Sequence, residues 1–158
     1  MAILVVYDSL YGNTEKIAKA IGDGISGEVK VLPASKVNLS ELKGLGLLIA
    51  GSPTHGGRPS PAMQEFLNKI PANGLEGIKV VAFDTRFAYK DHGFGLKILM
   101  TVLNFAAGKI ADALKKKGGS LVAEPEGFFV EGKEGPLKEG ELSRATTWAK
   151  GILQSKNF

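Results

Sequence analysis

Short runs of apolar residues, separated by segments with helical spacing, constrain the fold of this chain more than any other feature. The runs are residues 2–7, 45–50, 78–83 and 121–123. Nearly unbroken apolar runs of this kind are typical of strands covered on both faces in a parallel sheet. A further segment, residues 28–32, places Val29 and Val31 on one side, as a short strand at or near a sheet edge does. We therefore expect five strands.

Apolar residues recur at helical spacing between these strands, in residues 14–25, 60–70, 99–113 and 142–153. Ser60 and Pro61 supply an N-cap and a proline at the first helical position. Strands that alternate with helices in this way imply right-handed crossovers and a parallel sheet with helices on both faces. Residues 125–127 interrupt the last strand, and residues 128–130 either continue the sheet or cover its edge. With no linker in the chain, we expect a single α/β domain over residues 1–158.

Composition excludes several classes of function. The chain has no cysteine, so disulfides, thiolate metal sites and a cysteine nucleophile are ruled out. The formal charge is +4, but the densest basic run, residues 115–117, lies at the end of a helical pattern, where cations complement the helix dipole. We therefore expect no nucleic-acid partner. No apolar run approaches the roughly eighteen residues of a membrane span, and the start lacks the pattern of a signal peptide, so we expect a cytoplasmic protein.

The first strand is followed by a turn, residues 8–14, that has the features of a phosphate cage. Ser9, Asn13 and Thr14 offer polar side chains, and Gly12 allows a tight turn. The helix that begins at Thr14 directs its free N–H groups back into this turn. No Lys or Arg lies in it, so neutral donors and the helix dipole would hold the anion. The alternative is that Asn13 or Thr14 only caps the helix.

Two further loops follow the third and fourth strands. Residues 51–61 contain three glycines and three prolines, which specify a shaped backbone that a flat ring system can approach closely. The alternative is a turn that ends a strand and starts a helix. In residues 84–95, aromatic side chains could stack on a ring, while Thr85 and Arg86 could reach its polar edge. The alternative here is an exposed loop whose Tyr89 and Phe94 pack on the next helix.

These three loops resemble those of the flavodoxin family. Ser9 to Thr14, followed by Glu15, is similar to the family's phosphate loop, while residues 51–61 and 84–87 are similar to its two flavin-ring loops. The resemblance implies a three-layer, doubly wound, five-stranded parallel sheet of order 2-1-3-4-5, with a ligand crevice between strands one and three. It also implies flavin mononucleotide (FMN) as cofactor, and a peptide near the ring, at Gly56-Gly57, that changes its hydrogen bonding with redox state. The cofactor contacts expected from it are Ser9, Leu10, Tyr11, Gly12, Asn13, Thr14, Pro53, Thr54, His55, Gly56, Gly57, Asp84, Thr85, Arg86, Phe87 and Tyr89.

Three functions are compatible with this pattern. The first is an electron carrier, which needs no catalytic side chain and serves a redox partner protein or a small quinone-like acceptor. Carriers of this family are commonly acidic, whereas this chain has a pI near 9.2. The second is a flavin-dependent oxidoreductase of the quinone reductase or porphyrinogen-oxidising type, favoured by Arg86, because a cation near the ring would raise the two-electron potential. The third is a binding module without cofactor.

Two other motifs carry no function. Residues 22–27 match G-x-G-x-x-G, but they end a predicted helix and precede a strand, the reverse of a dinucleotide site. His55 and His92 do not have the spacing of metal ligands. Oligomeric state is left open by the sequence.

Overall fold

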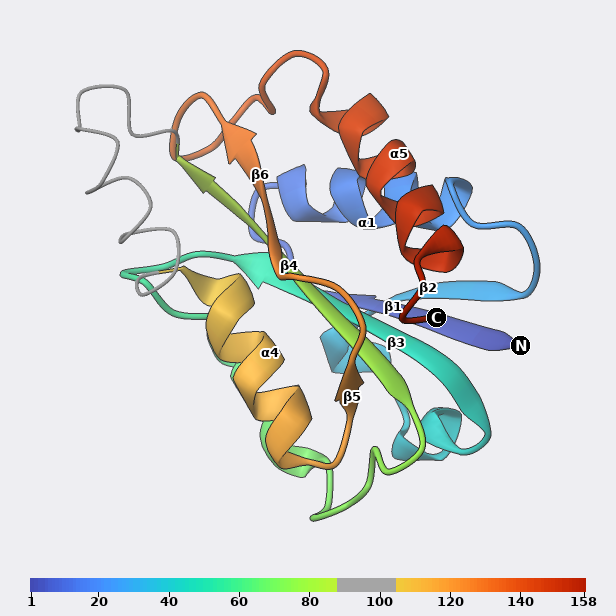
Figure 1. Ribbon diagram of the computed structural model, residues 1–158. Helices are drawn as coiled ribbons and strands as arrows, with labels where there is room; N and C mark the ends of the chain where they lie inside the picture. Colours follow the sequence, from blue (N-terminus) through green and yellow to red (C-terminus); the bar gives the residue numbers. More distant parts are fainter. Residues whose placement is uncertain (88–104) are drawn as a thin grey trace.

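The strands form one sheet that is parallel throughout (Figure 1). In this computed structural model, which describes residues 1–87 and 105–158, the path across the sheet is β2-β1-β3-β4-β5. The central strands are β1 (Ala2–Tyr7), β3 (Leu45–Pro53) and β4 (Lys79–Phe87), with β2 (Val29–Pro33) at one edge. The predicted order 2-1-3-4-5 is confirmed.

Two short strands share the other edge beside β4. β5 (Ser120–Leu121) pairs with the first residues of β4, whereas β6 (Glu126–Val130) pairs with the last part of it, from Phe83 to Phe87. Residues 128–130 therefore continue the sheet, which was one of the two alternatives left open by the sequence. The expected interruption is shorter than predicted, because Glu126 and Gly127 already belong to β6.

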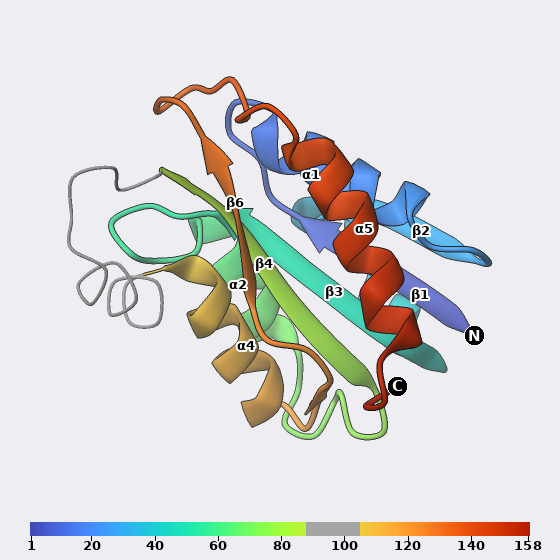
Figure 2. The same cartoon turned by 45° about the horizontal axis from the view of Figure 1, so that its top comes forward.

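Helices cover both faces of the sheet, as predicted (Figure 2). α1 (Asn13–Asp23) and α5 (Glu141–Gln154) lie together on one face. α2 (Pro61–Lys69) and α4 (Ala106–Lys116) cover the other. Two short 3₁₀ turns, η1 (Ala34–Lys36) and η2 (Leu39–Leu42), connect β2 to β3. The beginning of the helix predicted over residues 99–113 falls outside the described residues.

The apolar runs are buried on both sides because alternate side chains of a strand point to opposite faces. In β1, Leu4 and Val6 pack into the core beneath α2 and α4, and Ile3 and Val5 pack into the core beneath α1 and α5. Both cores need large apolar side chains, which explains why the sequence shows continuous runs rather than alternation.

The α5 side of the sheet contains a cluster of aromatic rings. Trp148 of α5 meets Phe128 of β6 edge to face at a centroid distance of 5.7 Å and Phe83 of β4 at 6.4 Å. The rings of Phe83 and Phe128 are 6.3 Å apart in the same kind of arrangement. The cluster joins α5 to the edge of the sheet that carries β6.

β3 and β4 are longer than the apolar runs that predicted them. β3 continues through Pro53, and β4 continues through Phe87. The assignment of residues 84–87 to a loop is therefore wrong: they pair with β6, and Asp84 and Thr85 also pair with the end of β3. Among the described residues, no helix combines the length and apolar character needed to cross a membrane.

Candidate functional site

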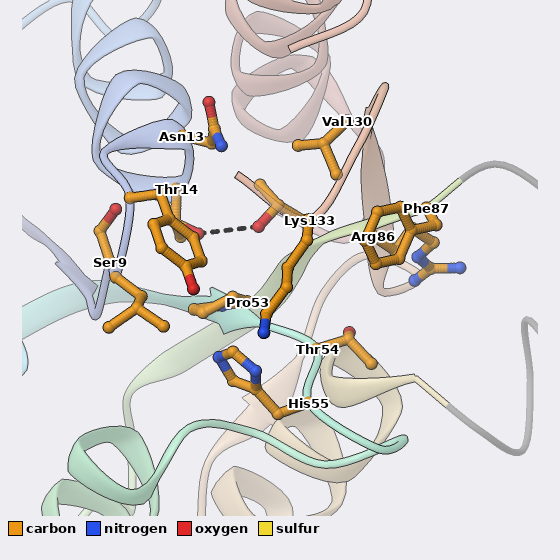
Figure 3. A pocket seen from close by; sticks show the side chains of 13 residues that line it. Ser9, Asn13, Thr14, Pro53, Thr54, His55, Arg86, Phe87, Val130 and Lys133 are labelled. Carbon is orange, nitrogen blue, oxygen red and sulfur yellow. Dashed lines mark hydrogen bonds between the residues drawn. The ribbon is translucent and has the colours of Figure 1, made fainter. Parts of the chain in front are cut away.

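A pocket lies at the carboxyl ends of β1, β3 and β4, where the strand order reverses (Figure 3). This is the place at which open parallel sheets bind ligands. Its walls come from the turn after β1, the ends of β3, β4 and β6, and the chain that follows β3 and β6. The lining residues are Ser9, Leu10, Tyr11, Asn13, Thr14, Pro53, Thr54, His55, Thr85, Arg86, Phe87, Val130 and Lys133.

The first turn of α1 offers unpaired donors to this pocket. Gly12 has a φ of 94°, and its N–H donates to Ser9 Oγ at 3.0 Å. No side chain caps the helix, so the alternative that Asn13 or Thr14 only caps it is wrong. Within residues 1–87 and 105–158, the N–H groups of Asn13, Thr14 and Glu15 have no acceptor. Uncapped N–H groups at the positive end of a helix dipole suit an anion.

Side-chain hydrogen bonds fix this turn to its surroundings. The hydroxyl oxygens of Thr14 and Thr85 lie 2.8 Å apart, and both residues are buried. Below the turn, the Tyr7 hydroxyl donates to Glu15 at 2.6 Å. Burial, together with this hydrogen bond to Glu15, raises the pKa of Tyr7 to about 12. The start of α1 is thus held against both β1 and β4.

The chain after β3 makes a tight two-residue turn. His55 and Arg58 exchange both backbone hydrogen bonds, at 2.9 and 3.0 Å, around Gly56 and Gly57. Both glycines have positive φ, 55° and 78°, as a turn of type I′ requires. His55 is exposed and lines the pocket, whereas the two glycines do not line it.

Asp84 and Arg86 form a buried ion pair at the end of β4. The Arg86 guanidinium donates to both carboxylate oxygens of Asp84 at 2.7 Å, and its Cζ lies 3.9 Å from the centre of the Phe105 ring. Burial raises the pKa of Asp84 above its usual 3.8 and outweighs the opposite influence of Arg86. Arg86 lines the pocket, but Asp84, fully buried, does not.

The same acidic residue holds the start of α4. Asp84 accepts the Ala107 N–H at 2.9 Å, and Thr54 Oγ1 accepts the Ala106 N–H at 3.1 Å. These two acceptors satisfy N–H groups that a helix start leaves without partners. The observed task of Asp84 is therefore to position Arg86 and α4, which the sequence analysis did not foresee.

Aromatic side chains stand at the rim of the pocket. Tyr11 is 42% exposed and Phe87 is 46% exposed, unusually high for large rings. Exposed rings beside a pocket offer stacking surface to a planar ligand. Tyr89 and Phe94, predicted for the same wall, lie outside the described residues.

Two lining residues, Val130 and Lys133, were missed by the sequence analysis. Val130 is the last residue of β6, and Lys133 lies in the connection between β6 and α5, which folds back on itself. Glu131 N–H donates to Pro136 O at 2.8 Å, and Gly135 N–H donates to Gly132 O at 3.0 Å, closing a β-turn with Lys133 at its tip. The paired glycines at 132 and 135 were the available signal for a turn, but nothing in the sequence locates that turn over the pocket.

The turn is docked on the start of α1. The side-chain amide of Asn13 donates to the carbonyl of Glu134 at 3.1 Å. The other end of the connection is held by Glu141 at the start of α5, which accepts the Phe129 N–H at 2.7 Å and binds Arg144. Burial alone raises the pKa of Glu141, but the hydrogen bonds from Arg144 and Phe129 outweigh it, so the pKa lies below the usual 4.5.

Sequence comparison gives matches over most of the chain. The sequence pattern of the family described as Flavodoxin matches residues 5–148. A flavodoxin of Clostridium saccharobutylicum is 32% identical over 130 residues, which is 80% of this chain and 79% of that protein.

Structural comparison shows the same fold in proteins of low sequence identity. A flavodoxin from the domain Archaea superposes with a TM-score of 0.76 at 23% identity, covering 98% of this chain and 97% of that one. Rubredoxin oxygen:oxidoreductase from the anaerobe Desulfovibrio gigas superposes with a TM-score of 0.69 at 22% identity, but this chain spans only 35% of it.

Proposed function

Because the chain belongs to the flavodoxin family, whose members are FMN-binding electron-transfer proteins, we propose that its pocket holds the FMN and delivers electrons to a redox partner. The phosphate would lie on the turn from Ser9 to Thr14. The ring would lie between residues 53–57 and the end of β4. When bound, FMN supplies the redox chemistry, because it accepts and donates one or two electrons.

The uncapped start of α1 carries this proposal. No side chain caps the N–H groups of Asn13, Thr14 and Glu15, and Asn13 and Thr14 line the pocket. A phosphate dianion suits this helix start, because the free backbone N–H groups can donate to its oxygens and the positive end of the helix dipole attracts its charge. The Ser9 hydroxyl, fixed by the Gly12 N–H, adds a further donor whose hydrogen is free to point at the ligand.

The ring wall supports the same assignment. Tyr11, Phe87 and His55 all line the pocket, and all three side chains are exposed. Stacking on a flat ring would cover apolar surface that these side chains now leave to solvent. Each side chain covered in this way would contribute roughly 25 cal/mol to the binding free energy for every Å² of apolar area removed from water.

The ion pair at the end of β4 weakens the case for a flavin enzyme. The hypothesis of an enzyme rests on Arg86 as an uncompensated cation near the ring, whereas Arg86 donates from Nε and Nη2 to the two carboxylate oxygens of Asp84. A protein partner or a small quinone-like acceptor that takes electrons from the exposed rim is the better match.

The test is titration of FMN into the apoprotein. Binding is read from quenching of flavin fluorescence and from the free energy of unfolding, which rises by about 2.7 kcal/mol when free FMN is a hundredfold above its Kd. Riboflavin, which lacks the phosphate, should bind much more weakly. A protein that neither quenches FMN nor gains stability would be the cofactor-free module.

Steady turnover separates carrier from enzyme. A carrier should show no steady oxidation of NADH or NADPH with a quinone, and its one-electron-reduced form should accumulate on photoreduction. Sustained turnover with the quinone would favour the oxidoreductase instead.

A further inference from the structure

We infer that Lys133, from the turn between β6 and α5, is the positive charge that stabilises reduced flavin in this pocket. The inference rests on the proposed function and adds a residue that neither the sequence pattern nor the three predicted loops contain. Figure 3 shows the Lys133 side chain entering the pocket from that turn, with its ammonium directed toward Pro53 and His55. This is the side of the ring loops, not of Ser9 and Asn13.

The backbone under Lys133 is fixed from several sides. The Gly135 N–H closes the turn on Gly132, and the Glu131 N–H and the Lys138 N–H bond to Pro136 and Phe129 across its base. The tip is then held by the amide of Asn13, which donates to the carbonyl of Glu134. A long side chain on a fixed turn loses less entropy on contact with a ligand than one on a free loop.

Close packing at this junction supports the same view. A Cβ added at Gly135 would lie 2.7 Å from the Asn13 side chain, and Gly135 has a φ of 103°. Only glycine allows the turn to approach α1 this closely. Asn13 is thereby a positioning residue for the turn that carries Lys133.

The charges around the pocket single out Lys133. Among the residues that line the pocket, the two cationic side chains are those of Arg86 and Lys133. Arg86 is neutralised by Asp84, whereas Lys133 makes no ion pair with any carboxylate in the described ranges, 1–87 and 105–158. Two-electron reduction leaves negative charge on the pyrimidine side of a flavin. An unpaired ammonium beside the ring favours that charged form over the neutral oxidised one.

The experiment compares Lys133→Gln with Lys138→Gln. Lys138 lies in the same connection and loses the same charge, but it stands near the Phe129 ring and does not line the pocket. We measure the Kd of oxidised FMN, the Kd of riboflavin, and the two-electron midpoint potential of each variant. Lys133→Gln should weaken binding of fully reduced FMN about tenfold relative to oxidised FMN, which equals a fall of about 30 mV. Lys138→Gln should leave the potential unchanged, and Lys133→Arg should restore it.

Asn13→Ala gives a second readout. If it acts by releasing the turn, its effect on the potential should not add to that of Lys133→Gln in the double variant. Full additivity would contradict the positioning role of Asn13.

Other outcomes overturn the inference without touching the proposed function. If Lys133→Gln weakens oxidised and reduced FMN equally, spares riboflavin and leaves the potential unchanged, the lysine serves the phosphate instead. If none of these quantities changes, Lys133 has no role toward the flavin. Failure of the unmodified protein to bind FMN would instead refute the proposed function.

Discussion

The hydroxyl oxygens of Thr14 and Thr85 lie 2.8 Å apart, joining the first turn of α1 to β4 across the floor of the pocket. Thr14 is 2% exposed and Thr85 is 5% exposed, so neither hydroxyl has ready access to water. Each hydroxyl can both donate and accept. The pair therefore joins the turn at the start of α1 to β4, the strand that carries Arg86 and Phe87 on the pocket.

Thr85→Val should lower the free energy of unfolding by about 1–3 kcal/mol, because it leaves the Thr14 hydroxyl buried without its partner. The same change should weaken FMN binding, since the turn at the start of α1 loses its link to β4. Denaturant unfolding and fluorescence titration measure the two effects. Thr85→Ser keeps the hydroxyl and should stay close to the unmodified protein; an equal loss in the serine variant would argue that the methyl group, not the hydroxyl, matters.

Asp84→Asn should destabilise the protein by about 3–5 kcal/mol, as expected when one partner of a buried ion pair is removed. The change strips Arg86 of its counter-charge and weakens the acceptor for the Ala107 N–H. Thermal or denaturant unfolding of the apoprotein measures the loss. A variant as stable as the parent would show that the pair contributes nothing net.

The pair also changes how Arg86→Ala must be read. Loss of a cation near the ring predicts a lower two-electron potential for that change, but removing Arg86 also leaves the Asp84 carboxylate without its ion-pair partner near the pocket. The double variant Asp84→Asn with Arg86→Gln removes both charges. We expect its potential to lie near that of the parent, because the pair is neutral as a whole; a fall as large as in Arg86→Ala would assign the effect to the arginine.

Glu141→Gln should lower the free energy of unfolding by about 1–3 kcal/mol at neutral pH. The pKa of Glu141 in the folded protein lies below its usual value of 4.5. Its ionised form therefore stabilises the fold above that pH, and the contribution disappears as pH falls through the lower, folded pKa. Unfolding curves measured from neutral pH downward should show the difference between parent and variant shrinking in that window. A difference that stays constant at acidic pH would exclude ionisation as its source.

Gly57→Ala should lower the free energy of unfolding by about 1–2 kcal/mol, because the turn holds residue 57 at a φ of 78°. Gly57→Asn should cost less, since asparagine tolerates this conformation better. Gly151→Ala is the matched control: it lies in α5 with open space around an added Cβ, and it should gain up to about 1 kcal/mol. Denaturant unfolding of the three variants tests the series, and equal effects at positions 57 and 151 would contradict the assigned strain.

The apolar runs predicted the strands because burial on both faces leaves a signal in every residue. The end of β4 carries no such signal. Asp84 and Arg86 are buried as a pair, and a charged residue in a sequence gives no indication that its partner lies two residues away on the same strand. Their polar character therefore suggested a loop.

The turn from Ser9 to Thr14 was predictable, since all its parts lie within one short stretch of chain. The position of Lys133 was not, because its turn is held by a contact between Asn13 and Glu134, 121 positions apart. No local pattern encodes such a contact.

Trp148 is the single tryptophan of the chain, and it packs against the rings of Phe83 and Phe128. Its emission is therefore a built-in optical reporter for the seating of α5 on the edge formed by β4 and β6. The strand that holds Phe128 leads directly into the turn of Lys133, so a variant that loosens this turn without unfolding the protein should be visible in the emission spectrum, with no label attached.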